Sequence, residues 1–138
     1  MNIKRAKKWL QFVAIAHIVG GILLPLLVFS SLSHAYFEQT LTRFPNGDIN
    51  AIKFFVAIFG PTVASWGLLF LYALDKAFRD RTSKDWWFLL VSILVWGVLD
   101  SGLSFYYLIY SHLVINGIAL LMLLLPLLIV KKHFIAKP

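Results

Sequence analysis

The chain has 138 residues, of which 60% are hydrophobic and only 14% are charged, and its mean hydropathy is +0.82. Because soluble domains carry roughly 25% charged residues, this composition excludes soluble enzymes, nucleic-acid-binding domains and disordered regulators, and it indicates a chain that lives in a lipid bilayer. The net charge of +7 does not indicate a nucleic acid partner, since the positive residues flank hydrophobic segments, and the lack of cysteine excludes disulfide and thiolate chemistry.

The first apolar segment covers residues 9–32 and follows a basic N-terminal stretch. As a helix its 24 residues would extend about 36 Å, which is enough to cross a hydrocarbon core of about 30 Å. The apolar core of a secretory signal is shorter, at about 7 to 15 residues. We therefore expect a first membrane span that is kept in the protein.

Residues 33–53 form the one long connection, which we expect to be an outer loop. Positions 44–48 read Phe-Pro-Asn-Gly-Asp, a sequence that favours a turn. Before this turn, residues 35–41 predict a short interfacial helix with Phe37 and Leu41 near one face.

Two further apolar stretches follow the loop. Residues 54–74 carry no charge and are long enough for one span. Residues 86–130 are too many for a single crossing and suit two helices, at about 86–106 and 111–130. A tight turn between Phe105 and His112 is expected to join them, because the tyrosines there are typical of the headgroup region.

The fold class predicted by these segments is an all-α integral membrane four-helix bundle, a single transmembrane domain over residues 1–138 with up-down-up-down order. Positive residues gather on the cytoplasmic side of short loops. Four spans place eleven Lys and Arg residues on the side of both termini and two, Arg43 and Lys53, on the other. The eleven are Lys4, Arg5, Lys7, Lys8, Lys76, Arg79, Arg81, Lys84, Lys131, Lys132 and Lys137. This bias predicts a multi-pass protein of the inner, cytoplasmic membrane with both termini in the cytoplasm.

Asp100 is the only Asp, Glu, Lys or Arg within the predicted spans. At the centre of a membrane helix Asp costs roughly 2.5 to 3.5 kcal/mol, so it normally faces other helices and has a partner. Asp100 and Asn116 each lie about 21 Å from the inner ends of their helices, which places them at one depth on adjacent helices. We expect a hydrogen bond between these two side chains.

Other polar groups and two prolines are expected near the same depth. Pro25 and Pro61 each leave a backbone carbonyl without its helical donor. The candidate binding residues of this outer-half cluster are Asp100, Asn116, Ser101, Thr62 and Ser104. Two interpretations stay open, a hydrogen-bonded clasp that holds the last hairpin together and a pocket for a ligand or ion.

A second polar layer lies nearer the inner face, where His17 shares a depth with Ser65 and Trp66. As a functional residue, His17 would relay protons toward Asp100, because imidazole titrates near neutral pH. As a structural residue, it would bond a serine hydroxyl or a backbone carbonyl.

We expect no cofactor and no catalytic site. The depths of the intramembrane histidines differ, so no level pair is available to hold haem. A metal site at the outer surface using His34, His112 and Glu38 lacks the usual spacing of a ligand set. The scattered serines show no nucleophile motif.

Three function classes stay open, because no motif names a reaction. The first is an accessory, assembly or interaction subunit of a larger membrane complex, which aromatic and glycine-lined helix faces would suit. The second is a small oligomeric transporter or channel that uses Asp100. The third is an intramembrane lipid-binding protein or enzyme that uses a pocket at Asp100 and Asn116. The expected partners are the lipid bilayer and other membrane proteins or a second copy of the chain.

Overall fold

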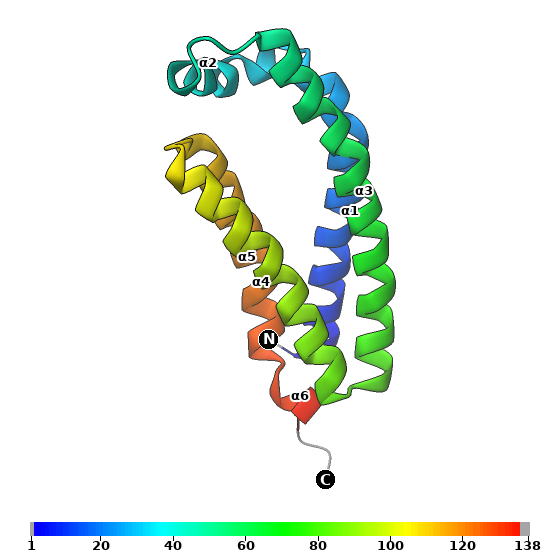
Figure 1. Ribbon diagram of the computed structural model, residues 1–138. Coiled ribbons are helices and arrows are strands. Elements are labelled where there is room, and N and C mark those ends of the chain that lie inside the picture. Colours follow the sequence, from blue (N-terminus) through cyan, green and yellow to red (C-terminus); the bar gives the residue numbers. More distant parts are fainter. Residues whose placement is uncertain (1, 136–138) are drawn as a thin grey trace.

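The computed structural model describes residues 2–135, which are largely helical and contain no strand (Figure 1). In chain order the elements are α1 (Ile3–Val28), the 3-10 helix η1 (Ser31–Ser33), α2 (His34–Arg43), α3 (Ile49–Asp80), α4 (Ser83–Tyr106), α5 (Tyr110–Ile129) and α6 (Lys132–Ile135). Within this range four helices, α1, α3, α4 and α5, are long and apolar enough to cross a membrane. The predicted all-α class is confirmed, and the number of helices that could cross a membrane equals the predicted number of spans.

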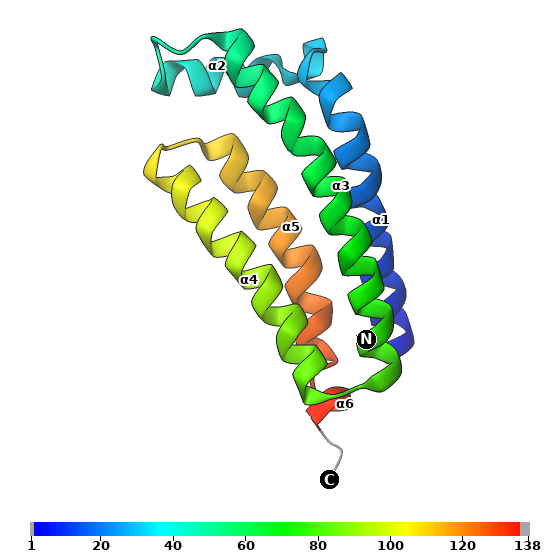
Figure 2. The same ribbon diagram turned by 45° about the vertical axis from the view of Figure 1, so that its right-hand side comes forward.

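The four long helices form two antiparallel hairpins that meet at one end of the molecule. α1 packs along α3 and α4 packs along α5, as Figures 1 and 2 show. The end where the hairpins meet holds the start of α1, the short connection from α3 to α4 and the end of α5, and we call it the basic end. It carries ten of the eleven basic residues grouped above, while Lys137 lies outside the described residues. The opposite end, the α2 end, holds η1, α2 and the turn from α4 to α5.

The main hydrophobic core lies toward the basic end and draws on all four long helices. Its largest side chain is Trp86, which is only 1% exposed. A much smaller cluster of Val28, Phe37 and Ala57 lies toward the α2 end and joins α1, α2 and α3. The hairpins are therefore packed together at the basic end and separate toward the α2 end (Figure 1).

Polar caps set where the helices begin, and these points differ from the limits of the apolar segments. α1 starts after Asn2, whose side chain accepts a hydrogen bond from the backbone N–H of Arg5 at 2.9 Å. α3 starts after Asp48, which caps it in the same way. The predicted span 54–74 was therefore shorter than α3, which runs to Asp80, because hydropathy marks only the apolar part of a helix.

α1 ends at Val28, four residues before the predicted limit at residue 32. The Ser33 hydroxyl donates to the carbonyl of Val28, and the Ser30 hydroxyl donates to that of Leu27, both at 2.7 Å. Carbonyls in the last turn of a helix have no helical donor, and serine side chains supply one here. The chain can therefore turn into η1 and α2 at this point.

The helix predicted at 35–41 is confirmed as α2, which lies across the α2 end (Figure 2). Its buried face carries Phe37 and Thr40. The predicted tight turn between the last two spans is also confirmed, because only residues 107–109 separate α4 from α5. Leu108 in this turn has a φ of 56°, in the left-handed region that normally favours glycine.

Two tryptophan side chains, one on α1 and one on α4, donate hydrogen bonds to backbone carbonyls of α5. Pro126 leaves the carbonyl of Met122 without its helical donor, and Nε1 of Trp9 donates to that carbonyl at 3.0 Å. Nε1 of Trp86 donates at 3.0 Å to the carbonyl of Leu127, in the last turn of α5. α1 and α4 are thus both joined to α5 by hydrogen bonds that satisfy otherwise unpaired backbone carbonyls.

The contact between α1 and α3 depends on glycine. The carbonyl of Gly21, which Pro25 deprives of its helical donor, lies so close to Gly60 that a Cβ there would collide with it. A Cβ on Gly21 would in turn lie 2.5 Å from the backbone nitrogen of Ala64. The two helices therefore pack backbone against backbone at this level.

We predict that Trp9→Phe will lower stability in the natural sequence and much less in a Pro126→Ala background. Alanine at position 126 restores the backbone N–H that pairs with the Met122 carbonyl, so the indole is no longer needed. An unpaired buried carbonyl costs about 1 to 3 kcal/mol, and we expect a coupling energy of about 1 kcal/mol. Unfolding in detergent micelles measures it, and additive effects of the two substitutions would contradict the role given to the indole.

Candidate functional site

A cavity of about 430 Å³ lies between the two hairpins, on the α2 side of the core. Most of its walls are apolar residues of α1, α3 and α5. Its polar lining residues are His17, Ser33, Tyr36, Asp100, His112 and Asn116. A smaller cavity of about 120 Å³ shares His17 and Trp96 with it. The separation of the hairpins thus places polar groups from α1, η1, α2, α4 and α5 around one space.

Asp100, His112 and Tyr36 form a hydrogen-bonded chain at this cavity. Nε2 of His112 lies 3.3 Å from Oδ2 of Asp100, and Nδ1 lies 3.1 Å from the Tyr36 hydroxyl. In the neutral ring, Nε2–H donates to the carboxylate and Nδ1 accepts from the phenol. In the protonated ring, Nδ1–H donates to the phenol oxygen instead. The chain therefore joins α4, α5 and α2 in both protonation states of the imidazole.

Asn116 is 2% exposed, and its side-chain nitrogen has no hydrogen-bond partner. The sequence predicts a bond from this amide to Asp100, and the amide does lie near that carboxylate, whose hydrogen bond by geometry is with Nε2 of His112. His112 lies about one helical turn nearer the α2 end than Asn116, and its long side chain reaches down to the carboxylate. An unpaired buried N–H costs about 1 to 3 kcal/mol, so a hydrogen-bond partner for this amide would stabilise the protein.

The three other residues of the predicted cluster have different surroundings. The hydroxyl of Ser104 is buried and donates at 2.8 Å to the carbonyl of Asp100 in its own helix. Thr62 lines the smaller cavity, and Ser101 is half-buried and lines neither of the two. The structure therefore gathers Asp100 and Asn116 at one cavity and places Thr62 in the adjoining one.

His17 of the second predicted layer lines both cavities. Its Nδ1 lies 2.7 Å from the carbonyl of Val13, and its ring lies against Trp66 with ring centroids 5.1 Å apart. The backbone bond matches the structural interpretation of His17, and it leaves Nε2 as the acceptor of the neutral ring. Ser65, although next to Trp66 in the sequence, is exposed and lines neither cavity.

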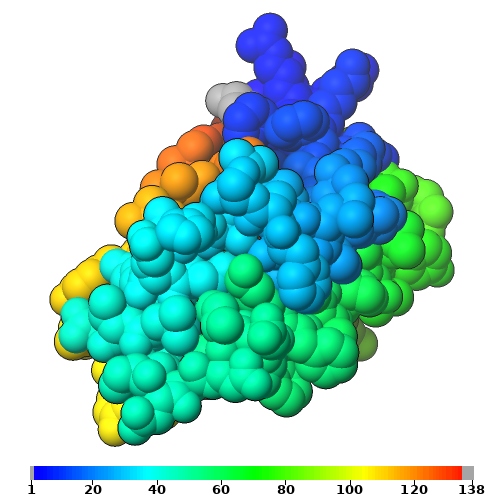
Figure 3. Space-filling model, turned by 90° about the horizontal axis from the view of Figure 1, so that it is seen from above, coloured from blue at the N-terminus to red at the C-terminus, as the bar shows by residue number. Residues whose placement is uncertain are grey.

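α2 is held over this end of the cavity by contacts with α5 and its preceding turn. Oε1 of Gln39 accepts hydrogen bonds from the backbone N–H of Ser111 at 2.9 Å and from its hydroxyl at 2.6 Å. The ring of Phe44 lies against that of Tyr107, with centroids 5.1 Å apart. Viewed from above, α2 spreads over the ends of the helices (Figure 3). Because Ser111 is in the first turn of α5, where N–H groups have no helical acceptor, Gln39 acts as its cap.

Sequence reasoning missed Tyr36 and Gln39 as parts of the site. Their partners on α5 are 76 and 72 positions away. A sequence signal existed only for His112, since it lies about one helical turn from the depth of the single intramembrane carboxylate.

Burial raises the pKa of the Tyr36 phenol above the 10.0 of an unperturbed tyrosine, and the carboxylate of Asp100 raises it further. The phenol therefore stays neutral near physiological pH and acts as a hydrogen-bond donor or acceptor. A raised pKa is the opposite of the lowered pKa that activates a nucleophile.

The candidate metal ligands His34 and His112 have separate partners. Nδ1 of His34 lies 3.4 Å from the Glu38 carboxylate on the exposed face of α2. His112 instead bonds Asp100 and Tyr36. Among residues 2–135, no group of three or more His, Asp or Glu side chains is placed to hold a metal ion.

Comparisons of the chain with protein-family models, with curated proteins and with solved structures found no significant match.

We predict that Tyr36→Phe will loosen α2 and leave the four long helices folded. The substitution removes the hydroxyl that bonds His112 and keeps the ring that lies against Phe37. Hydrogen–deuterium exchange should become faster for backbone amides of His34–Arg43 and stay unchanged in α1 and α3. Tyr106→Phe, at an exposed tyrosine of α4, is the matched control and should leave exchange in α2 as it is.

The raised pKa of Tyr36 predicts how pH affects the docking of α2. The docked state favours the neutral phenol, so its contribution to stability is complete below pH 10.0 and is lost as pH rises through the raised pKa. The phenolate absorbance of the natural protein minus that of Tyr36→Phe should show one tyrosine that titrates above pH 10.0. Titration at or below that value would be inconsistent with a buried, hydrogen-bonded phenol.

Proposed function

We propose that the protein binds an amphiphilic small molecule of the membrane in the cavity between its two hairpins. The observation that carries the proposal is the buried, unpartnered amide nitrogen of Asn116 at this cavity. A ligand with a hydrogen-bond acceptor, such as a carbonyl or ester oxygen, would supply the missing partner. The Asp100–His112 pair lines the same cavity and would contact the polar part of the same ligand.

The size and lining of the cavity support an amphiphile. Small-molecule sites enclose about 300 to 1,000 Å³ and are mostly apolar with a few placed polar groups, and this cavity of about 430 Å³ fits that description. Leu24, Val56 and Ile115 are among the apolar residues that would hold the hydrocarbon part. Because the cavity lies among the long apolar helices, the bilayer itself is the source of ligand.

The state of the polar groups supports binding over catalysis. Tyr36 is a neutral phenol, and the hydroxyl of Ser104 is committed to its own helix. Asp100 is paired with an imidazole that also bonds Tyr36. Covalent catalysis needs a nucleophile activated by a base or by a lowered pKa. The Tyr36 hydroxyl does bond the imidazole of His112, but the pKa of this phenol is raised and not lowered. We therefore propose a lipid-binding protein and not an enzyme.

The proposed orientation places the basic end in the cytoplasm, with the spans running up-down-up-down across an inner membrane. Ten described Lys and Arg residues at the basic end support it, against Arg43 and Lys53 toward the α2 end. In this orientation the polar part of the cavity lies in the outer half of the bilayer.

Mass spectrometry of the purified protein tests the binding proposal. In mild detergent the natural protein should retain a stoichiometric lipid-like molecule that organic extraction releases. Asn116→Leu removes the amide that would bond the ligand. The amount of retained molecule should fall about tenfold, as expected for the loss of one buried hydrogen bond. Ser65→Leu, a polar-to-apolar change at an exposed position of α3, is the matched control and should retain the molecule.

Thermal unfolding separates this proposal from a purely structural clasp. Without ligand, Asn116→Leu should melt at the same temperature as the natural protein or higher, because it removes an unpaired buried polar group. If Asn116→Leu melted at a lower temperature than the natural protein and still retained the lipid-like molecule, the result would support the clasp and refute the binding site. An empty natural protein after gentle purification would also refute it.

A second candidate function is an accessory subunit of a larger membrane complex. Glycines on outer helix faces favour it, because a Cβ at Gly20 or Gly102 would meet nothing within 4 Å. Small residues on such faces let a partner helix approach closely. We expect a partner protein to co-purify stoichiometrically with the natural protein from native membranes. This partner should be lost when Gly20→Leu and Gly102→Leu are combined in one variant. Recovery of the same proteins with both forms would argue against contact at these faces.

A further inference from the structure

A second hollow, the basic groove, lies between α3 and α4 near the basic end and is separate from the cavity described above. Its volume is about 450 Å³. It is lined by the apolar and aromatic residues Leu69, Tyr72, Ala73 and Phe88, by the lysines Lys76 and Lys84, and by Asp85. Leu69 and Phe88 are both exposed, so the groove is open toward the surrounding bilayer.

Apolar and basic residues occupy different parts of the basic groove. On α3, Leu69 comes seven residues before Lys76, which corresponds to about 10 Å along the helix. Tyr72, which is 75% exposed, lies between them. On α4 the order is reversed in sequence, since Lys84 precedes Phe88 by about one turn. The groove therefore has a basic part at the edge of the apolar region and an apolar part within it.

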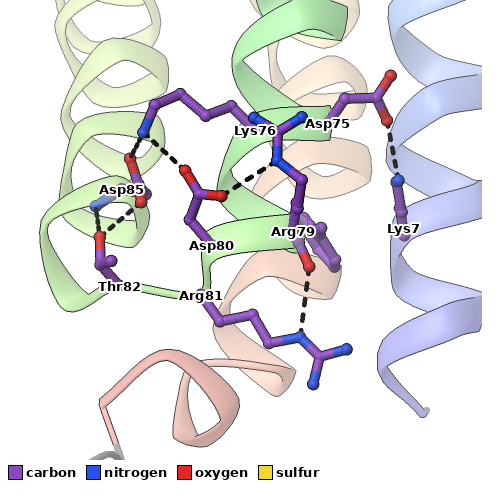
Figure 4. Close-up of polar contacts among 9 residues, drawn as sticks. Lys7, Asp75, Lys76, Arg79, Asp80, Arg81, Thr82 and Asp85 are labelled. Carbon is purple, nitrogen blue, oxygen red and sulfur yellow. Dashed lines mark hydrogen bonds and ion pairs between the residues drawn. The ribbon is translucent and has the colours of Figure 1, made fainter.

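The acidic side chains near the groove are already neutralised by contacts within the protein (Figure 4). Nζ of Lys76 lies 3.0 Å from Asp85 and 3.2 Å from Asp80. Asp80 also pairs with Arg79 at 3.1 Å. Within residues 2–135, Lys84 makes no ion pair, so its positive charge is available in the groove.

We propose that the basic groove binds an anionic phospholipid from the leaflet at the basic end. The phosphate would pair with Lys84 and approach Lys76, and one acyl chain would lie against Leu69, Ala73 and Phe88. Basic pockets between membrane helices are suited to anionic headgroups, because positive charge, hydrocarbon and aqueous phase meet there. The apolar part of the groove selects a lipid over a free phosphate, since a free phosphate has nothing to place against it.

Titration of the purified full-length chain with defined lipids, followed by native mass spectrometry, tests the proposal. Dioleoylphosphatidylglycerol should bind several-fold more tightly than dioleoylphosphatidylcholine, which has the same chains and no net charge. Lys84→Gln should weaken phosphatidylglycerol binding about fivefold, the effect of one lysine near an anionic surface, and leave phosphatidylcholine binding unchanged. Lys84 is exposed, so this change does not disturb the core.

Lys132→Gln is the matched control, since Lys132 is an exposed lysine at the same end but outside the groove. It should bind phosphatidylglycerol as the natural sequence does. Equal losses in Lys84→Gln and Lys132→Gln would show attraction to the overall positive charge and would overturn the proposal. Equal affinity of the natural protein for the two lipids would overturn it too.

Ala73→Phe tests the apolar part of the groove without changing any charge. The larger side chain should occupy the place of the acyl chain and weaken the binding of both lipids. The melting temperature of the variant checks that it is folded. Unchanged binding of phosphatidylglycerol would show that the groove is not the site. Displacement of the lipid by an equal concentration of glycerol 3-phosphate would show that the headgroup alone is bound, against the proposal. Asn116→Leu should bind phosphatidylglycerol normally, which keeps this test independent of the cavity.

Discussion

Inside a bilayer each polar group has to find its partner within the protein, because hydrocarbon offers none. This constraint accounts for several of the bonds that join the helices here. The Trp9 indole pairs with the Met122 carbonyl, and His112 pairs with the only charged side chain of the apolar spans. Asn116 is the exception, since its amide nitrogen is buried without a partner. The exception lies at the cavity between the hairpins, where the proposed small molecule would complete the bonding that the chain leaves unfinished.

Uneven packing of the two hairpins gives the molecule two different hollows. Large side chains such as Trp86 fill the space between the hairpins at the basic end, and no comparable set fills it toward the α2 end. The inner space that remains has Tyr36 of α2 at one end and is lined mostly by apolar residues, with a few polar groups. The outer groove between α3 and α4 is instead bordered by lysines whose acidic neighbours are already paired. One hollow is therefore suited to a neutral polar group and the other to an anionic one.

Depth along a helix was predictable from the sequence, whereas direction around the helix axis and the docking of a loop helix were not. The number of spans and the tight turn after α4 followed from the lengths of apolar segments, which are local properties. Counting residues also placed Asp100 and Asn116 at one level, and both line the cavity. The same count grouped Ser65 with Trp66, yet adjacent residues on a helix point about 100° apart and Ser65 is exposed. Tyr36 was missed because its partner belongs to another hairpin.

The hydrogen bonds that hold α2 in place limit the order in which the helices can assemble. α2 is synthesised early, but two of the hydrogen bonds that hold it come from His112 and Ser111, at the start of the last long helix. Until that helix has left the ribosome and entered the membrane, these polar groups of α2 have no partners, while α1 and α3 can already pack through Gly21 and Gly60. α2 can therefore take its place only after α5 has been made, whereas the packing of α1 against α3 needs no later segment.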